Sequence, residues 1–317
     1  MRLMIPKEIG HADIVALNLN DATETEYVYS SSPTYNVDDI RMVSYDSDGS
    51  TYRMPVKLYK ALKSTSSYPP DNSSGTDPDW EDLGAVNKHK MFDIFINTIA
   101  LADGTESTDA GKIVMEIDAG KQDLIGLINL VGTKVTFELL DSADTVIDTI
   151  VYNLSTVVHD WEEYFYTDFE YGRDLIIPFT RLLVSNIKIT IEHEITDQYP
   201  GLGYAKLGKR LFAGQVFGEP GSGLLDFSTV ARSADGAIAF EEGDYAKTMS
   251  LDIRVANEDY DKVQKAVALI RGKPTIFEGL EDQDYEAFTV LGFVRNFDLI
   301  LRGGRKSGCN LEIEGLI

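Results

Sequence analysis

The segment most similar to a catalytic signature is glycine-rich: Gly203-Tyr-Ala-Lys-Leu-Gly208-Lys209-Arg210. It matches the Gly-x-x-x-x-Gly-Lys part of a phosphate-binding loop, in which backbone N–H groups and a lysine hold nucleotide phosphates. Such a loop also needs Ser or Thr as the next residue, to ligate magnesium, and it must open a helix. Here Arg210 takes that position and a strand-like run, 211–217, follows. We therefore interpret the segment as a turn with basic residues between two strands.

A second candidate for chemistry is the acidic segment Asp46-Ser-Asp48-Gly49, which is similar to the start of a calcium-binding loop. An EF-hand loop needs glycine at its sixth position and glutamate at its twelfth, and this segment has neither. Asp-Gly between two strand-like runs is by itself a turn signal. We therefore predict a hairpin turn here and no metal site.

Cysteine and histidine point to no metal site or nucleophile. Cys309 is the only cysteine, so the sequence offers no disulfide and no cysteine-based zinc site, and we expect this residue in the core. None of the histidines is paired at metal-ligand spacing. They are His11, His89, His159 and His193. Acidic pairs such as Asp160 and Glu163 could serve a glycosidase, but 52 acidic residues supply such pairs by composition. We predict no catalytic residue, no metal and no cofactor.

Aromatic residues are the one local feature that favours binding. Rings on a small β-scaffold can stack on sugars, while neighbouring Asp, Asn and Ser side chains bond to the hydroxyls. The candidates for carbohydrate binding are Tyr52, Tyr59, Tyr68 and Trp80. The alternative is that so small a module uses these rings as its own core, because large side chains supply most of the area it can bury. Trp80 in particular is expected to pack inward.

Charge restricts the partners. The chain has 317 residues, with 29 Lys and Arg against 52 Asp and Glu, which gives a net charge of −23. This balance argues against nucleic acid and against an anionic membrane surface, since both need positive charge. The start of the sequence has no signal-peptide pattern, and its most apolar stretch, 175–189, is short and contains charges. We expect synthesis in a cytoplasm and no membrane insertion.

The elements that would position these residues are mostly strands. We predict a mainly β fold in three parts: a small aromatic β-module, an antiparallel β-sandwich and a C-terminal α+β domain with one helix. The boundaries follow shifts in composition. They give an N-terminal arm and module in 1–89, the sandwich in 90–213 and an oligomerisation domain in 214–317.

Period-two alternation is the evidence for the strands, because every second side chain of a strand faces the same side. The expected inward sets are 113, 115 and 117; 135, 137 and 139; 187, 189 and 191; 249, 251, 253 and 255; and 309, 311 and 313. Strand-like runs at Ile40–Tyr45 and Tyr52–Leu62 belong to the module. The one convincing helix is expected to begin at Asn257 as N-cap and to end at Arg271-Gly272.

Two segments of the sequence, taken together, carry a resemblance to one group of proteins. The first consists of 33–43, 58–62, Pro70 and 79–93, and it ends in Asn87-Lys-His-Lys-Met91-Phe92-Asp93. The second is Gly292-Phe293-Val-Arg-Asn-Phe297 followed by Cys309-Asn-Leu311-Glu-Ile313-Glu314-Gly315-Leu316. Between them, 127–130, 161–164 and 246–249 stand in the expected order. The first resembles a small chitin-binding-type carbohydrate module of tailed-bacteriophage virion proteins, and the second resembles the ending of the same proteins.

The resemblance implies a non-enzymatic tail-tip or baseplate component of a virion, either distal-tail or hub-like. Such a protein would form a homo-oligomeric ring that joins the tail tube to hub, fibre or receptor-binding proteins. The C-terminal strand–helix–strand unit would resemble the tube-like domains that build such rings. In a ring the charge of −23 per subunit would add up, so we expect assembly to weaken at low ionic strength. Two alternatives stay open: a receptor-binding protein that attaches to host-surface glycan, and a tail-spike glycan hydrolase.

Overall fold

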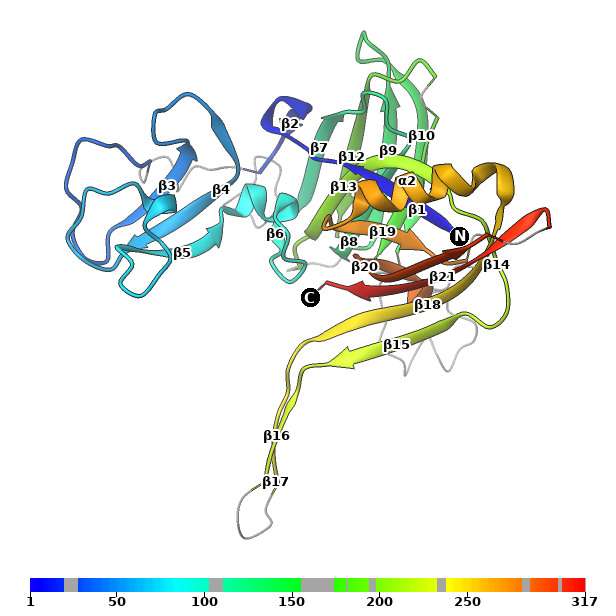
Figure 1. Ribbon diagram of the computed structural model, residues 1–317. Helices are drawn as coiled ribbons and strands as arrows, with labels where there is room; N and C mark the ends of the chain where they lie inside the picture. The colour runs from blue at the N-terminus through cyan, green and yellow to red at the C-terminus, as the bar shows by residue number, and fades with distance from the viewer. Residues whose placement is uncertain are drawn as a thin grey trace, which may run out of the picture.

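The structure is a computed structural model that describes residues 1–19, 28–102, 111–154, 174–180, 182–193, 198–232, 238–280, 286–301 and 304–316. In these residues the fold is mainly β, its paired strands are antiparallel, and α2 (Tyr260–Ile270) is the α-helix (Figure 1). The predicted mainly β fold is therefore confirmed. In the described part of the chain, no helix has the length and apolarity that crossing a membrane requires.

The largest sheet has eleven strands. Its order is β11 (Leu175–Pro178), β8 (Leu124–Val131), β13 (Gly201–Phe212), β1 (Arg2–Lys7), β19 (Thr275–Glu278), β20 (Thr289–Ile300), β21 (Lys306–Gly315), β18 (Tyr245–Ala256) and β14 (Gln215–Val216). Two further strands join it at its sides: β15 (Gly221–Asp226) pairs with β18, and β6 (Ala100–Leu101) pairs with β13.

The described residues also form three smaller sheets and five short 3-10 helices. The five-stranded sheet runs β10 (Val146–Asn153), β9 (Lys134–Leu140), β12 (Asn186–Glu192), β7 (Lys112–Asp118), β2 (Ile14–Leu17). The three-stranded sheet is β3 (Ile40–Tyr45), β4 (Tyr52–Ala61), β5 (Trp80–Ala85), and the two-stranded ribbon is β16 (Thr229–Arg232) and β17 (Ile238–Glu241). The 3-10 helices are η1 (His11–Asp13), η3 (Pro69–Asp71), η4 (Asn87–Phe92), η5 (Asn257–Asp259) and η6 (Glu286–Phe288).

The five-stranded sheet packs face to face against part of the large sheet. The alternating apolar residues of β7, β9 and β12 point into this core, as their period predicts, and Phe137 at its centre is fully buried. The large sheet contributes Ile125 and Leu127 from β8 and Leu202 and Leu207 from β13. The two layers form the antiparallel sandwich that the sequence favours.

A second core lies beneath α2. Alternating residues of β18 and β21 face it, and Cys309 lies among them, 5% exposed, so its predicted place in the core is confirmed. Val263, Ala266 and Ile270 form the buried stripe of the helix. The predicted N-cap is wrong: Asn257 opens the 3-10 turn η5, and its Oδ1 accepts a hydrogen bond from Ser307 Oγ at 2.7 Å. The side chain is therefore used to hold β21, outside the helix.

The glycine-rich segment is neither a phosphate-binding loop nor a turn. It lies inside β13, a continuous twelve-residue strand that pairs with β8 on one side and β1 on the other. Its glycines admit close neighbours: a Cβ at Gly208 would meet Ile5 O at 2.6 Å, and one at Gly203 would meet Ile96 O at 2.5 Å. Glycine in a strand marks such an approach of another backbone. The interpretation as a turn between two strands is corrected accordingly.

The large sheet draws its strands from all three predicted parts of the chain. β1 lies between β13 and β19, so residues from 1–89, 90–213 and 214–317 share one sheet. The predicted boundary after residue 213 thus separates strands of the same sheet. The three-stranded sheet, in contrast, lies entirely within 1–89 and stands apart from the larger sheets (Figure 1).

η4 joins this small sheet to the rest of the molecule through two buried side chains. Asn87 bonds both ways with the backbone of Leu101, accepting its N–H at 3.0 Å and donating to its carbonyl at 2.8 Å. His89 Nδ1 accepts the N–H of Val56 on β4 at 2.9 Å. The small sheet and β6 are thereby both tied to the same six-residue turn.

Candidate interaction surfaces

Two of the four aromatic residues predicted to bind carbohydrate lie inside the small sheet. Trp80 is 0% exposed and Tyr59 is 5% exposed. They form one core with Tyr35, Val43 and Ala61, in which the Trp80 and Tyr35 ring centroids lie 5.5 Å apart in an edge contact. The predicted inward packing of Trp80 is confirmed. Neither buried ring offers a face on which a sugar could stack.

The other two aromatic residues are half-buried and already in contact with neighbours. Tyr52 stacks on His11 with ring centroids 4.1 Å apart. The hydroxyl of Tyr68 donates to the carbonyl of Tyr45 at 2.6 Å. The structure therefore does not bring the four predicted residues together on one surface, and carbohydrate binding by Tyr52 and Tyr68 stays a prediction.

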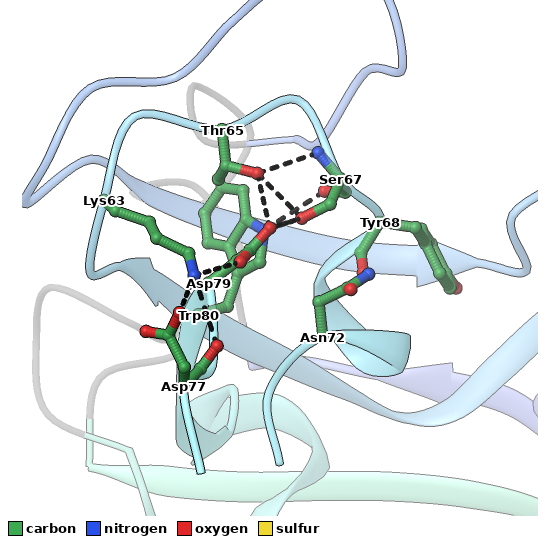
Figure 2. A network of polar contacts seen from close by, with 8 residues as sticks. All are labelled: Lys63, Thr65, Ser67, Tyr68, Asn72, Asp77, Asp79 and Trp80. Carbon is green, nitrogen blue, oxygen red and sulfur yellow. Dashed lines mark hydrogen bonds and ion pairs between the residues drawn. The ribbon is translucent and has the colours of Figure 1, made fainter. Parts of the chain in front are cut away.

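A polar network beside Trp80 closes the loop between β4 and β5 (Figure 2). One oxygen of Asp79 accepts from Thr65 Oγ1 at 2.8 Å and Ser67 Oγ at 2.6 Å, and the other pairs with Lys63 Nζ at 2.8 Å. The indole N–H of Trp80 donates to the Ser67 carbonyl at 3.1 Å. The ion pair with Lys63 and the two hydroxyl donors lower the pKa of Asp79 to about 2. This carboxylate is therefore a structural acceptor that holds the loop over the tryptophan.

Acid is expected to destabilise the small sheet through Asp79. Its folded pKa of about 2 lies below the ordinary 3.8, so its contribution is complete above about pH 5 and is lost as the pH falls through 2. Asp79→Asn should abolish this dependence and cost about 1 kcal/mol at neutral pH, allowing for solvent screening. Asp77→Asn is the control, because Asp77 also pairs with Lys63 but its side chain is 88% exposed. Unfolding followed by amide exchange in 28–86 at pH 2 to 7 measures both; equal effects would contradict the role of Asp79.

The ribbon β16–β17 projects away from the rest of the molecule (Figure 1). Val230 pairs with Phe240 and Arg232 with Ile238, and residues opposite one another share a face. One side therefore carries Arg232 and three apolar residues, Val230, Ile238 and Phe240, which are 60%, 46% and 78% exposed. We call these three residues the apolar face of the ribbon. The opposite side carries Thr229, Ala231, Ala239 and Glu241.

A second uncovered apolar surface lies where η4 ends. Ile94 and Phe95 are 60% and 52% exposed and line an open concavity of about 750 Å³. The remaining apolar lining is Pro274, Phe293, Val294 and Leu316. We refer to this site as the concavity.

A buried carboxylate fixes the loop that presents Phe95 to the concavity. Asp93, 5% exposed, accepts the N–H of Phe95 at 2.8 Å and the hydroxyl of Thr98 at 2.9 Å. Burial raises the pKa of Asp93. These hydrogen bonds hold the loop in place, and the loop in turn keeps the side chain of Phe95 exposed.

Metal-binding and nucleophilic chemistry find no support in the described residues. Across the described ranges, no three or more His, Cys, Asp or Glu side chains gather as a metal site would require. Burial raises the pKa of Cys309 to about 11, so its thiol stays protonated at neutral pH. The carboxylate pair Asp160 and Glu163 lies outside the described residues.

Neither apolar surface was recognised in the sequence. A signal for the ribbon exists: Asp235-Gly236 stands between two runs with apolar residues in alternation, which is a hairpin pattern. The concavity has no such signal, because its lining comes from turns and strands far apart in the chain. Compared with known proteins, the chain matches no protein-family model, no curated protein and no solved structure.

Proposed function

We propose that this chain is a structural, non-enzymatic protein of a tailed-bacteriophage virion, in which copies form a ring at the distal tail or baseplate. The ring would join the tail tube to hub, fibre or receptor-binding proteins. The assignment to a phage virion follows from the resemblance of segments within 33–93 and 292–316 to such proteins. The observation that carries an assembly role is the projecting ribbon, which holds an apolar face away from the molecule's own cores.

The ribbon needs a partner on energetic grounds. An isolated two-stranded hairpin is marginally stable in water, and three or more strands or a packing surface are needed for independent stability. Phe240 at 78% exposed and Val230 at 60% exposed remain hydrated unless another surface covers them. Burying apolar area stabilises by about 25 cal/mol per Å². Exposed apolar patches of this kind mark protein–protein contacts.

The same observations favour assembly over the two alternatives. The prediction of glycan binding named four aromatic side chains, and two of them, Trp80 and Tyr59, are buried in the core of the small sheet. A glycan hydrolase would need a carboxylic acid that donates a proton near neutral pH, and Asp79 of the polar network is instead held ionised by its partners. The small sheet then serves as a rigid module carried on η4.

Light scattering of the purified chain at several salt concentrations tests the assembly role. We expect an oligomer whose mass falls at low ionic strength, because −23 charges per subunit repel one another. Phe240→Asp should shift it to monomer, whereas Ile147→Asp, 43% exposed on β10, should leave the mass unchanged. Immunogold labelling of phage particles should place the N-terminus at the tail tip. A monomer at every concentration and salt would contradict the proposal, as would label on the head.

A further inference from the structure

We infer that the ribbons of successive copies stack face to back, so that the apolar face of one ribbon lies on the opposite face of the next. This inference rests on the proposed assembly function and adds the surfaces through which the copies meet. We call the opposite side the alanine face; it consists of Thr229, Ala231, Ala239 and Glu241. A contact between two different faces is heterologous, and it closes into a ring when its rotation allows.

Both faces of the ribbon are uncovered in the described part of the chain. All residues of β16 and β17 are exposed. The ribbon stands clear of the larger sheets (Figure 1), so the cores of its own copy do not cover it. A partner on one face alone would leave a two-stranded sheet with its other side in water, and such a sheet is marginally stable at best. In a closed ring, face-to-back stacking covers both faces of every ribbon through one repeated contact.

The two faces are complementary in the size of their side chains. Phe240, 78% exposed, pairs with Val230 on the apolar face, whereas Ala231 pairs with Ala239 on the alanine face. Side chains on the inner faces of packed sheets interdigitate across about 10 Å, so large side chains of one ribbon can lie over the alanines of the next. Two alanine faces would bury little apolar area against each other. Stacking of like faces therefore leaves one side of each ribbon poorly covered.

The two faces are also complementary in charge. The register places Arg232 on the side of the apolar face and Glu241 on the alanine face. Stacking two apolar faces would put two copies of Arg232 in one layer, and stacking two alanine faces would do the same with Glu241. Face-to-back stacking puts a cation and an acid in every layer. For subunits of net charge −23, a contact that pairs opposite charges is the favoured one.

Paired single-cysteine chains test which faces meet. In a Cys309→Ala background, Val230→Cys marks the apolar face and Ala231→Cys marks the alanine face. The two chains are co-expressed, one lengthened by a tag, and treated with a short bismaleimide, so that mixed dimers separate on a denaturing gel. We expect the mixed dimer at a level several-fold above the dimer that either chain forms alone. As the control, Val151→Cys on β10 replaces Ala231→Cys, because Val151 is also exposed, at 51%. Equal crosslinking of like faces or of the control, or no crosslinking, overturns the inference.

Exchange of the two charges tests the same contact without a crosslinker. Arg232→Glu should shift the oligomer towards monomer in light scattering, because each layer then holds two acids. Adding Glu241→Arg to the same chain should restore the oligomer, since each layer again joins a cation to an acid. The double variant has the net charge of the unchanged chain, so rescue reports the position of the charges. A double variant as dissociated as the single one contradicts the stacking.

A further substitution separates this inference from the function it rests on. Ala239→Gln places a bulky polar side chain on the alanine face and should reduce the oligomer to monomer, whereas Thr149→Gln on β10 should leave the mass unchanged. If Phe240→Asp dissociates the oligomer and Ala239→Gln does not, the alanine face is uncovered and the stacking is wrong, although the assembly function stands. An oligomer that survives both substitutions also overturns the stacking. If the unchanged protein is a monomer under all conditions, both proposals fail.

Discussion

Trp80→Ala is expected to unfold the small three-stranded sheet and leave the two larger sheets folded. Trp80 is fully buried, and its ring lies 5.5 Å from that of Tyr35 and 6.4 Å from that of Tyr29. Its indole N–H also bonds to the loop that Asp79 closes. Truncating a buried tryptophan costs about 3–5 kcal/mol. A sheet of three short strands has little other core, so this loss is expected to exceed its stability.

Hydrogen exchange measured by mass spectrometry distinguishes local from global unfolding. Amides in 40–61 should lose protection in the variant, whereas those of β9 and β12 should keep it. Leu83→Ala is the control, because Leu83 lies on the same strand, β5, and is 44% exposed. Loss of protection throughout the chain would mean that the small sheet and the larger sheets unfold as one unit, and unchanged protection would contradict the role of Trp80.

Gly292→Ala is expected to have the second largest effect, through the backbone of the large sheet. Gly292 lies opposite Gly315 where β20 pairs with β21. A Cβ at this position would collide with the carbonyl oxygen of Glu314 and come within 2.8 Å of Gly315 Cα. These atoms belong to the main chain, so no rotamer change relieves the contact and the strands must separate. We expect a loss at the upper end of the range for overpacking, about 3 kcal/mol.

Chemical denaturation of the purified variant measures this loss as a lower midpoint. Gly304→Ala is the matched control, because a Cβ at Gly304 meets no atom within 4 Å. If the two variants had equal midpoints, β20 and β21 could not be as close at Gly292 as the structure shows.

Strand positions were predictable because alternation is a local property. The inward sets of β7, β9, β12, β18 and β21 follow from period two alone, and each is buried. The end of α2 was predictable in the same way, since Gly272 takes the left-handed conformation, φ +71°, that the turn after the helix requires. The start of α2 was not predictable, because the side chain of Asn257 bonds to that of Ser307, which lies fifty residues away in the chain.

The sequence-based interpretation was wrong where residues far away in the chain decide whether a segment forms a strand. Gly203 and Gly208 are turn-like residues in their own sequence context. They are strand residues because β13 pairs with β8 and β1, and glycine is needed there because the backbone at Ile96 and Ile5 comes close. The aromatic residues show the same limit, because composition predicts a cluster of rings and only packing decides which of them, such as Trp80, are covered.

The place of β1 has a consequence for the order in which the protein can fold. Arg2 lies opposite Phe212 on β13 and Glu278 on β19, so β1 leaves the ribosome long before either of its partners. Until β19 has been synthesised, β1 has an open edge that invites pairing with other chains. Contacts so distant in sequence predict slow folding. The two parts of the eleven-stranded sheet can be joined only after β19 has been synthesised, so a chain that is truncated before β19 would leave β1 open on that side.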